Sequence, residues 1–227
     1  MYKLMSIVML MLMTSWSYAN DIYVTQSGAS LDLDITQDGS NNTVGNSTTA
    51  SASTGATTIL NIDQIGNSNV IKYQINGATY TGVINLVGNS NDVDLNCDST
   101  GNNSSCGSAN AVINFTGNSN DIDLDIGQTS SATSADVDIV GQSGSDSNVV
   151  AATVDGNSAI LTITINGDTN NYLLDIDGNG DVNGHTLIHS HTGGIADVDI
   201  TQSGTNDNMI TLTTSGDNAD IDISQTD

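Results

Sequence analysis

A chain of 227 residues with 26 acidic and only two basic side chains has a formal net charge of −24, and every acidic residue is Asp. Phosphate binding needs Lys and Arg, so this composition excludes nucleic acid as a partner and disfavours anionic membrane surfaces. Glu, Arg and Pro are absent, whereas Val, Ile, Leu and Thr dominate the ordered runs, which favours strands over helices.

Residues 1–19 have the pattern of a cleaved secretory signal peptide. Lys3 supplies a positive start, residues 4–13 form an apolar segment, and residues 17–19 (Ser-Tyr-Ala) match a small-x-small cleavage site. The apolar segment is shorter than the roughly 20 residues of a membrane-spanning helix; a buried core helix is the alternative. We therefore expect an exported chain that starts at Asn20, without membrane insertion.

Glycine recurs every 11 residues along much of the chain, and alternating runs such as DLDI, DVDL and DIDLDI lie between the glycines. Alternation with period two places apolar side chains on one face of a strand, and Gly, Asn and Ser form turns. One strand and one turn take 11 residues, so two such units form a rung of about 22. The sequence predicts an all-β fold, a β-solenoid of strand–turn–strand rungs over residues 20–227. The spacing is seen at Gly28 and Gly39, at Gly66, Gly77 and Gly88, and at Gly156, Gly167 and Gly178.

Three segments interrupt the period, and we expect irregular insertions at rung corners near residues 47–58, 97–106 and 181–194. Elsewhere the alternation predicts which aliphatic side chains point inward, with the Asp residues between them facing outward. The expected inward positions are Ile35, Ile62, Val93, Leu95, Ile122, Leu124, Val137, Ile139, Ile163, Ile165, Val198, Ile200, Ile221 and Ile223.

The two cysteines, Cys97 and Cys106, are close in sequence. In an exported protein such a pair favours a disulfide. The alternative, a metal site, needs further ligands nearby, and none is obvious in the sequence.

Several turns share a motif, Q-x-G-x-x-N. Two carry it in full, two have one extra residue before the Asn, and one lacks the Asn. Gln and Asn side chains carry both donors and an acceptor, so copies stacked one rung apart form an amide ladder. The motif residues are Gln26 and Gly28; Gln37, Gly39 and Asn42; Gln64, Gly66 and Asn69; Gln142, Gly144 and Asn148; and Gln202, Gly204 and Asn208.

This motif, in a 22-residue frame behind a signal peptide, resembles the curlin repeat of bacterial curli fibre subunits. The resemblance implies a secreted structural subunit that self-assembles end to end into extracellular, amyloid-like fibres for adhesion and biofilm matrix. It further implies a Gram-negative-type host cell surface, with copies of the chain, a nucleator subunit and an outer-membrane secretion channel as partners. The chain departs from the family where aliphatic residues or Phe115 replace the Gln, so hydrophobic packing should interrupt the amide ladder.

Two other functions remain open as alternatives. The first is a monomeric acidic β-solenoid adhesin or fibre segment, and the second is a solenoid enzyme that processes polysaccharides with clustered Asp side chains. The sequence contains no nucleophile elbow, phosphate loop or recognisable acid–base pair, so we do not expect an enzyme.

One turn resembles a calcium loop, with Asp175, Asp177, Asn179 and Asp181 in alternating positions. Thr186 stands where such a loop needs Glu, and an ordinary polar turn is the alternative. We expect no other cofactor. The outward Asp pairs either bind cations that relieve repulsion between rungs or keep the secreted chain soluble.

The three histidines, His185, His189 and His191, lie close together. His189 and His191 share one strand face, which could suit a metal. We expect surface residues in an irregular rung instead.

Overall fold

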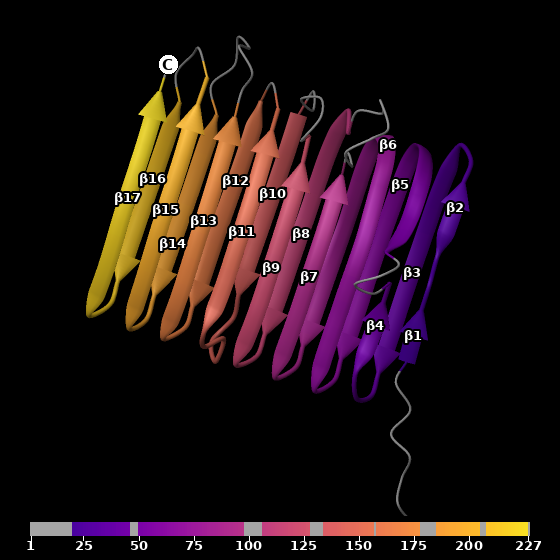
Figure 1. The fold of residues 1–227 in the computed structure, drawn as a ribbon, viewed down its shortest axis with the longest axis horizontal. Helices are drawn as coiled ribbons and strands as arrows, with labels where there is room; N and C mark the ends of the chain where they lie inside the picture. The colour runs from indigo at the N-terminus through magenta and orange to yellow at the C-terminus, as the bar shows by residue number, and fades with distance from the viewer. Residues whose placement is uncertain are drawn as a thin grey trace, which may run out of the picture.

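The computed structural model describes residues 20–45, 50–97, 106–127, 134–156, 158–177, 185–204 and 208–226. All regular elements in these ranges are strands, and each strand pairs in parallel with the equivalent strand of the next rung. The strands lie in two layers along one long axis, from β1 at one end to β17 at the other (Figure 1). The predicted all-β β-solenoid is confirmed.

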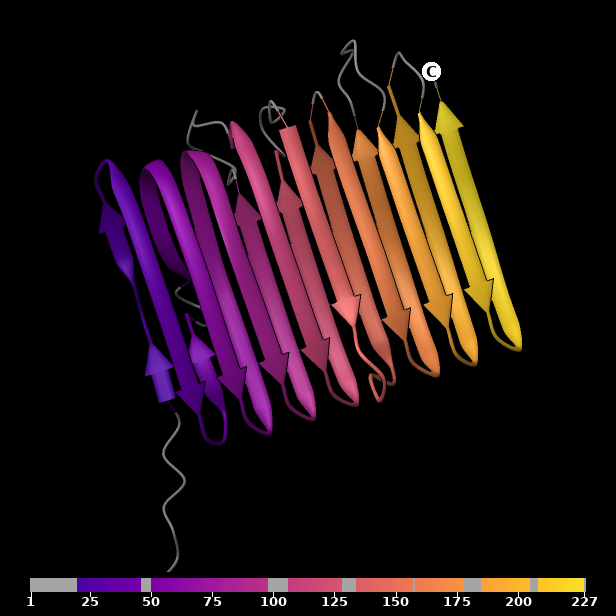
Figure 2. The ribbon, with the colours of Figure 1, turned by 180° about the vertical axis from the view of Figure 1, so that it is seen from behind.

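The two layers are parallel ladders, here called ladder A and ladder B, and Figure 2 shows them from behind. Ladder A consists of β1 (Asn20–Ile22), β2 (Thr25–Ser27), β4 (Asn42–Val44), β7 (Ser90–Cys97), β9 (Ser119–Ile126), β11 (Asn148–Asp155), β13 (Thr169–Asp177), β15 (Ile195–Ser203) and β17 (Asn218–Thr226). Ladder B consists of β3 (Ser30–Asp38), β8 (Ser108–Thr116), β10 (Ser134–Gly141), β12 (Ala159–Asn166), β14 (Thr186–Thr192) and β16 (Met209–Ser215). Two long strands, β5 (Ser51–Ile65) and β6 (Ser68–Val87), turn the corner and pair in both ladders.

Rung length varies more than the sequence period indicates. The pairs Asn69–Asn91 and Asn148–Asn170 are 22 residues apart, but Asn91–Asn120 are 29 apart. The extra residues lie outside the ladders, because the strands keep register across them: Asn91 pairs with Asn120 and Cys97 with Ile126. Insertions therefore lengthen a rung without shifting side chains between the inner and outer faces.

Inward side chains from both ladders form one continuous core, whose largest fully buried members are Tyr73, Tyr80, Tyr172 and Phe115. All the predicted inward residues are buried except Ile221 and Ile223, which are 37% and 48% exposed. Both lie on β17, the last described strand, where the described residues supply no further rung to cover them. Elsewhere each buried Ile or Leu contributes about 1.5–3 kcal/mol relative to an exposed one.

Two of the three predicted insertions are wrong in extent. Residues 51–58 belong to β5, and the extra residues lie between Val44 and Ser51, which stack on Ile71 and Tyr73. Similarly, Thr186–Thr192 form the regular strand β14. The insertion near 97–106 begins where β7 ends at Cys97, and residues 98–105 lie outside the described ranges.

Candidate functional site: side-chain ladders and open ends

A ladder of buried asparagines follows one corner of ladder A. In each step the amide nitrogen of one Asn donates to the amide oxygen of the Asn in the next rung, at 3.2, 3.1 and 2.8 Å in the first three steps. All members beyond the first are at most 2% exposed. The members are Asn20, Asn42, Asn69, Asn91, Asn120, Asn148 and Asn170.

Each ladder Asn also closes a corner. Its amide nitrogen donates to a turn carbonyl, such as Ile65 O for Asn42 at 2.9 Å and Gly167 O for Asn170 at 2.8 Å. Both amide hydrogens are therefore used inside the fold, and turn carbonyls that would otherwise be unpaired are satisfied. Most members share the sequence signal G-x-x-N; Asn148 has one extra residue after its Gly, and Asn20 has no Gly before it. The predicted motif also demanded Gln, and it therefore missed Asn91, Asn120 and Asn170, while Asn20 lacks the Gly as well.

The glutamines form two short pairs, one near each end of the molecule. On ladder B, Gln64 Nε2 donates to Gln37 Oε1 at 2.6 Å. On ladder A, Gln225 Nε2 donates to Gln202 Oε1 at 3.2 Å. Between the ends the same columns hold Leu86 and Phe115, or Ile126 and Ile176, as the predicted interruption requires. Gln142, by contrast, is exposed and lies outside both columns.

The glycines stack in columns at the rung corners. A Cβ on Gly66 would lie 2.1 Å from Gly39 O, and one on Gly117 would lie 1.7 Å from Gly88 O. At the opposite corner, a Cβ on Gly77 would lie 2.2 Å from Gly55 O. Such distances exclude any side chain, and two corners per rung account for the spacing of 11 residues. Of the other motif glycines, Gly144 and Gly204 have positive φ angles of 88° and 154°, and Gly28 stacks below Gly55.

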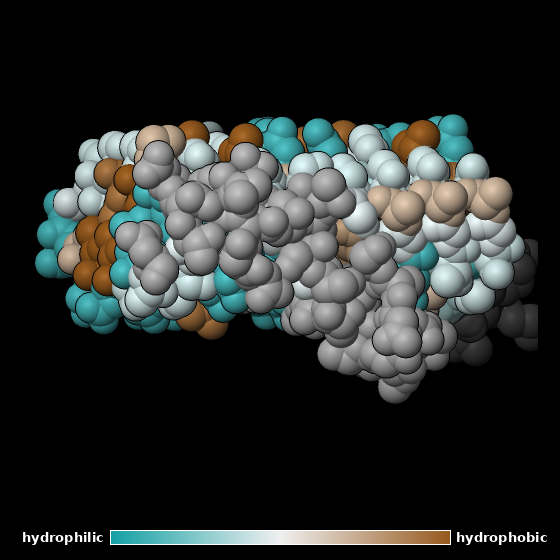
Figure 3. Space-filling model, turned by 90° about the horizontal axis from the view of Figure 1, so that it is seen from above, coloured by the Kyte–Doolittle hydropathy of each residue, from teal (hydrophilic) through white to brown (hydrophobic). Residues whose placement is uncertain are grey.

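The C-terminal end, formed by β16 and β17, is open. Hydrophobic atoms gather there, at the left of Figure 3, where Met209, Ile221 and Ile223 are all more than a third exposed. The amide nitrogen of Asn208 is shielded from water yet has no hydrogen-bond partner. The described residues provide no strand beyond β17, whose outer backbone edge is therefore unpaired.

The N-terminal end, formed by β1, β2 and β3, is open in the same sense. Asn20 Nδ2 donates to Asn42, while the Asn20 oxygen accepts nothing from the described residues. Gln26 Nε2 donates to Ser30 O at 3.2 Å, but its buried Oε1 has no partner. Each end therefore leaves buried amide groups unsatisfied, at a cost of about 1–3 kcal/mol for each group.

The outer face of ladder A carries stacked carboxylates. Asp92 stacks on Asp121 and Asp94 on Asp123, and Lys72 Nζ lies 2.7 Å from Asp92 and 3.8 Å from Asp94. Burial, with the charges of Asp125, Asp94 and Asp121, raises the pKa of Asp123. Repulsion within the columns is thus only partly relieved by the single nearby cation.

Two of the predicted calcium residues, Asp175 and Asp177, lie on this same outer face at β13. Burial and the neighbouring charges of Asp177 and then Asp175 raise the pKa of Asp155 to about 6. Asp177 accepts a hydrogen bond from Ser203 at 2.8 Å. Asn179 and Asp181 lie outside the described residues, and within the described ranges no three His, Cys or Asp side chains form a group that could hold a metal ion.

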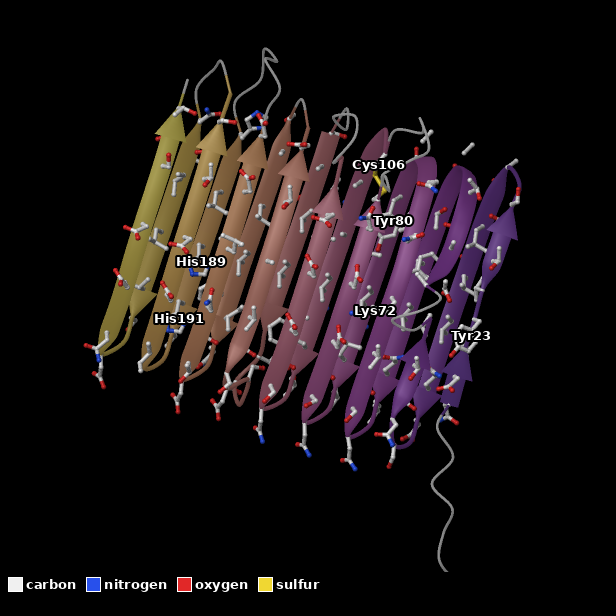
Figure 4. All side chains as sticks on the ribbon, viewed as in Figure 1. Tyr23, Lys72, Tyr80, Cys106, His189 and His191 are labelled. Atoms are coloured by element: carbon white, nitrogen blue, oxygen red, sulfur yellow. A yellow bond between two sulfur atoms is a disulfide. The ribbon has the colours of Figure 1, made fainter. Side chains whose placement is uncertain are left out.

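The histidines are buried and not on the surface, contrary to expectation. His185, His189 and His191 are each 1% exposed. β14 places His189 and His191 in the inner columns of ladder B, and His185, just before β14, accepts a hydrogen bond from Ala159 N. His191 Nδ1 lies 3.2 Å from the Tyr172 hydroxyl, and the ring centroids of Tyr172 and His189 are 4.3 Å apart (Figure 4). Burial and the nearby His191 lower the pKa of His189 to about 4.

Cys97 and Cys106 form a disulfide, as expected from their spacing. Both are fully buried, and the bond connects the end of β7 to the segment that precedes β8. Figure 4 shows this bond in yellow beside the Cys106 label, near the upper ends of the strands. The bond therefore constrains the rung that runs from Asn91 to Asn120, which is 29 residues long.

No helix within the described ranges is long and apolar enough to cross a membrane. No family model, curated protein or solved structure matches the chain.

Proposed function

We propose that this protein is an exported structural subunit that stacks end to end into extracellular amyloid-like fibres. The observation that carries the proposal is the pair of open ends, each with an unpaired strand edge and an uncovered core. Parallel strand edges of this kind are templates for further strands. The sequence resemblance to curlin repeats supports the same function.

The surface of the solenoid favours growth along its axis rather than sideways association. Most outer positions of the two ladders are polar or charged, with single exposed aliphatic side chains such as Val149, Leu173 and Ile188 among them. The stacked Asp residues on these faces repel a like-charged neighbour. Only the two ends expose the inner columns. The ends are therefore the surfaces on which a second copy buries apolar area, and no catalytic side chain is required.

The remaining parts of this proposal follow from the resemblance alone. The subunit would act at the cell surface in adhesion and biofilm matrix, with a nucleator subunit and an outer-membrane channel as further partners. Calcium is not required for this stacking in our proposal.

Fibre formation by the chain beginning at Asn20 tests this function. We expect thioflavin binding and unbranched fibres in electron micrographs within days. A matched pair of variants locates the growing surface: Ile221→Lys at the open end should block growth, and Ile188→Lys on an outer face should not, although both residues are 37% exposed. A monodisperse monomer at high concentration would overturn the proposal and favour the acidic adhesin.

A further inference from the structure

The two glutamine pairs look like halves of one longer ladder. Gln202 and Gln225 end ladder A at the C-terminal end, and Gln37 and Gln64 begin ladder B at the N-terminal end. The resemblance extends to the backbone: Gln37, Gln202 and Gln225 each donate to the carbonyl of the residue 17 positions earlier. The pairs belong to different ladders, so simple translation of one copy along the axis does not bring them together.

The ladders also differ in length. Ladder A begins with β1 and ends with β17, whereas ladder B begins with β3 and ends with β16. Ladder A therefore has one layer more than ladder B. If a second copy were stacked without rotation, with its β1 and β2 on β17, one strand position in ladder B would stay empty between β16 and β3. Its core side chains and backbone edges would remain uncovered.

A rotation of 180° about the solenoid axis removes this gap. The rotation exchanges the ladders, so the next copy places β1 and β2 on β16 and places β3 on β17. Strands within one ladder are parallel, and strand direction reverses between the ladders, so the rotation also keeps every new pair parallel. No strand position is left empty.

The side chains that meet in the first of these pairs are complementary. With the register of the inner columns continued, Asn208 meets Asn20, Ile210 meets Ile22, Leu212 meets Val24 and Thr214 meets Gln26. The unpartnered Asn208 amide nitrogen faces the Asn20 oxygen, and the Thr214 hydroxyl can donate to the unpartnered Gln26 Oε1. Two unsatisfied amide atoms, one at each end of the molecule, gain partners together.

The second pair, β17 on β3, joins near-identical sequences. Residues 219–225 read ADIDISQ and residues 31–37 read LDLDITQ. Ile221 then meets Leu33, Ile223 meets Ile35, and Gln225 meets Gln37. This contact covers the two isoleucines that the last rung leaves exposed.

The hydrogen bonds between side-chain amides keep the same donor-to-acceptor direction across the contact. In both glutamine pairs Nε2 donates toward the preceding rung, from Gln64 to Gln37 and from Gln225 to Gln202, so Gln37 continues the series by donating to Gln225. In the buried Asn ladder each Nδ2 donates toward the following rung, so Asn208 continues that series by donating to Asn20. Both ladders pass through the contact without a reversal.

We infer that copies of this chain join with a half-turn about the solenoid axis, β16 pairing with β1 and β2 and β17 pairing with β3 of the next copy. The inference rests on the proposed function, since it specifies how the fibre's subunits meet. One subunit then supplies 17 half-rungs, so the fibre advances by about 41 Å per subunit at the usual spacing between strands.

Cysteine cross-linking tests the register. Asp220 stacks on Asp32 of the next copy in the half-turn contact and on Asp21 in the unrotated one. Cα atoms of paired strands lie close enough for a disulfide. Asp220→Cys protein is therefore mixed with either Asp32→Cys or Asp21→Cys protein, fibres are grown, and brief oxidation is followed by a non-reducing gel and mass spectrometry.

We expect the Asp32→Cys mixture to give at least tenfold more covalent dimer than the Asp21→Cys mixture. Fibres with dominant Asp21→Cys dimers, or with neither dimer, would overturn the half-turn contact and leave the proposed function standing. No fibres from the parent chain would overturn both. Electron cryo-microscopy gives an independent readout, with successive subunits related by about 180°, apart from the solenoid's own twist, or by no such rotation.

The contact also has a cost that can be measured. It stacks Asp220 on Asp32 and Asp222 on Asp34, and like charges at this spacing repel. Replacing Asp32 and Asp34 with Asn should speed fibre elongation about fivefold or more at low salt. The matched control replaces Asp136 and Asp138, outward residues in the middle of ladder B that stack on Asn110 and Val112. Equal acceleration by both double variants would contradict the contact.

Discussion

The middle rungs, from β6 to β13, and the C-terminal rungs, from β14 to β17, share a backbone but have different interiors. In the middle, Asn69 to Asn170 form an unbroken ladder over aliphatic columns. In the C-terminal rungs, Ala196 and Ala219 replace the Asn, and His189 replaces an Ile. The difference teaches that a repeat can keep its register while changing its interior. The Asn ladder is continuous in the middle, although Tyr80 Oη and Asn96 Oδ1 there lack partners, whereas at the C-terminal end the ladder stops and both ring nitrogens of His189 lack partners.

Asn120→Ala should give the largest loss of stability. It removes one of the two acceptors of the Asn91 amide nitrogen and the ladder donors to the Asn148 oxygen and the Gly117 carbonyl. We expect this to lower the free energy of unfolding by about 4 kcal/mol. Asn208→Ala, at the open end, should cost about 1 kcal/mol or less. Urea unfolding at concentrations below those of assembly measures both. Equal losses would contradict the difference between the two regions.

Acid should unfold the C-terminal rungs first. The pKa of His189 falls from 6.5 in the unfolded chain to about 4 in the fold, so the unfolded chain takes the proton first. The neutral His189 side chain therefore contributes to the free energy of unfolding in full above pH 6.5. This contribution, on the order of 3 kcal/mol, is lost as the pH falls toward 4.

His189→Leu tests this dependence. Asp155, whose pKa is raised to about 6, has the opposite effect, because its contribution is present at low pH and lost as the pH rises. The difference in unfolding free energy between parent and variant isolates the histidine. Hydrogen exchange should show β14 and β16 opening in acid in the parent only; identical acid opening in the variant would refute the assignment.

The disulfide should matter less than the Asn ladder. Replacing both Cys97 and Cys106 with Ala opens a loop with a sequence separation of 9, and we expect a loss of about 2–3 kcal/mol. The measurement is the urea midpoint of the double variant against that of the parent. A collapse of all strand signal would mean that the middle rungs depend on the cross-link rather than on their ladders.

Lys72→Gln should have the smallest effect. The Lys72 side chain is 18% exposed and that of Asp92 is 47% exposed, so solvent screens the pair and the loss should stay below about 1 kcal/mol. The loss should shrink further in 0.5 M salt, on the scale expected for screened surface charges. A loss that persists in high salt would indicate that the lysine stem contributes by packing.

The period and alternation were enough to predict the solenoid and all but two of the inward residues, because these depend on local pattern. The disulfide was predicted separately, from two cysteines close together in a chain expected to be exported. The predicted motif found Gln37 and Gln64 and the ladder members Asn42, Asn69 and Asn148, but it missed Asn91, Asn120 and Asn170. The Gln requirement hid the simpler G-x-x-N spacing, which is set by the corner and not by the strand.

The histidines were misplaced for a different reason. Residues 181–194 break the period, so sequence alone gave no frame in which to decide whether His189 faces in or out. In the structure His189 pairs with the inward residue Ile163, which shows that His189 also faces inward. Likewise, Ile221 and Ile223 are exposed because they lie on the last described strand. The alternation of apolar residues predicts which face a side chain is on, but not whether another rung covers it.

The asparagine ladder behaves as a single unit. Each amide from Asn20 to Asn148 points the same way, so turning one side chain over would set nitrogen against nitrogen on one side and oxygen against oxygen on the other. The aligned dipoles polarise one another, and the carbonyl at each corner fixes the same sense. Orientation is thus a collective property of the row, and a single reversed amide would break the hydrogen bonds on both of its sides, between two stretches that still point the same way.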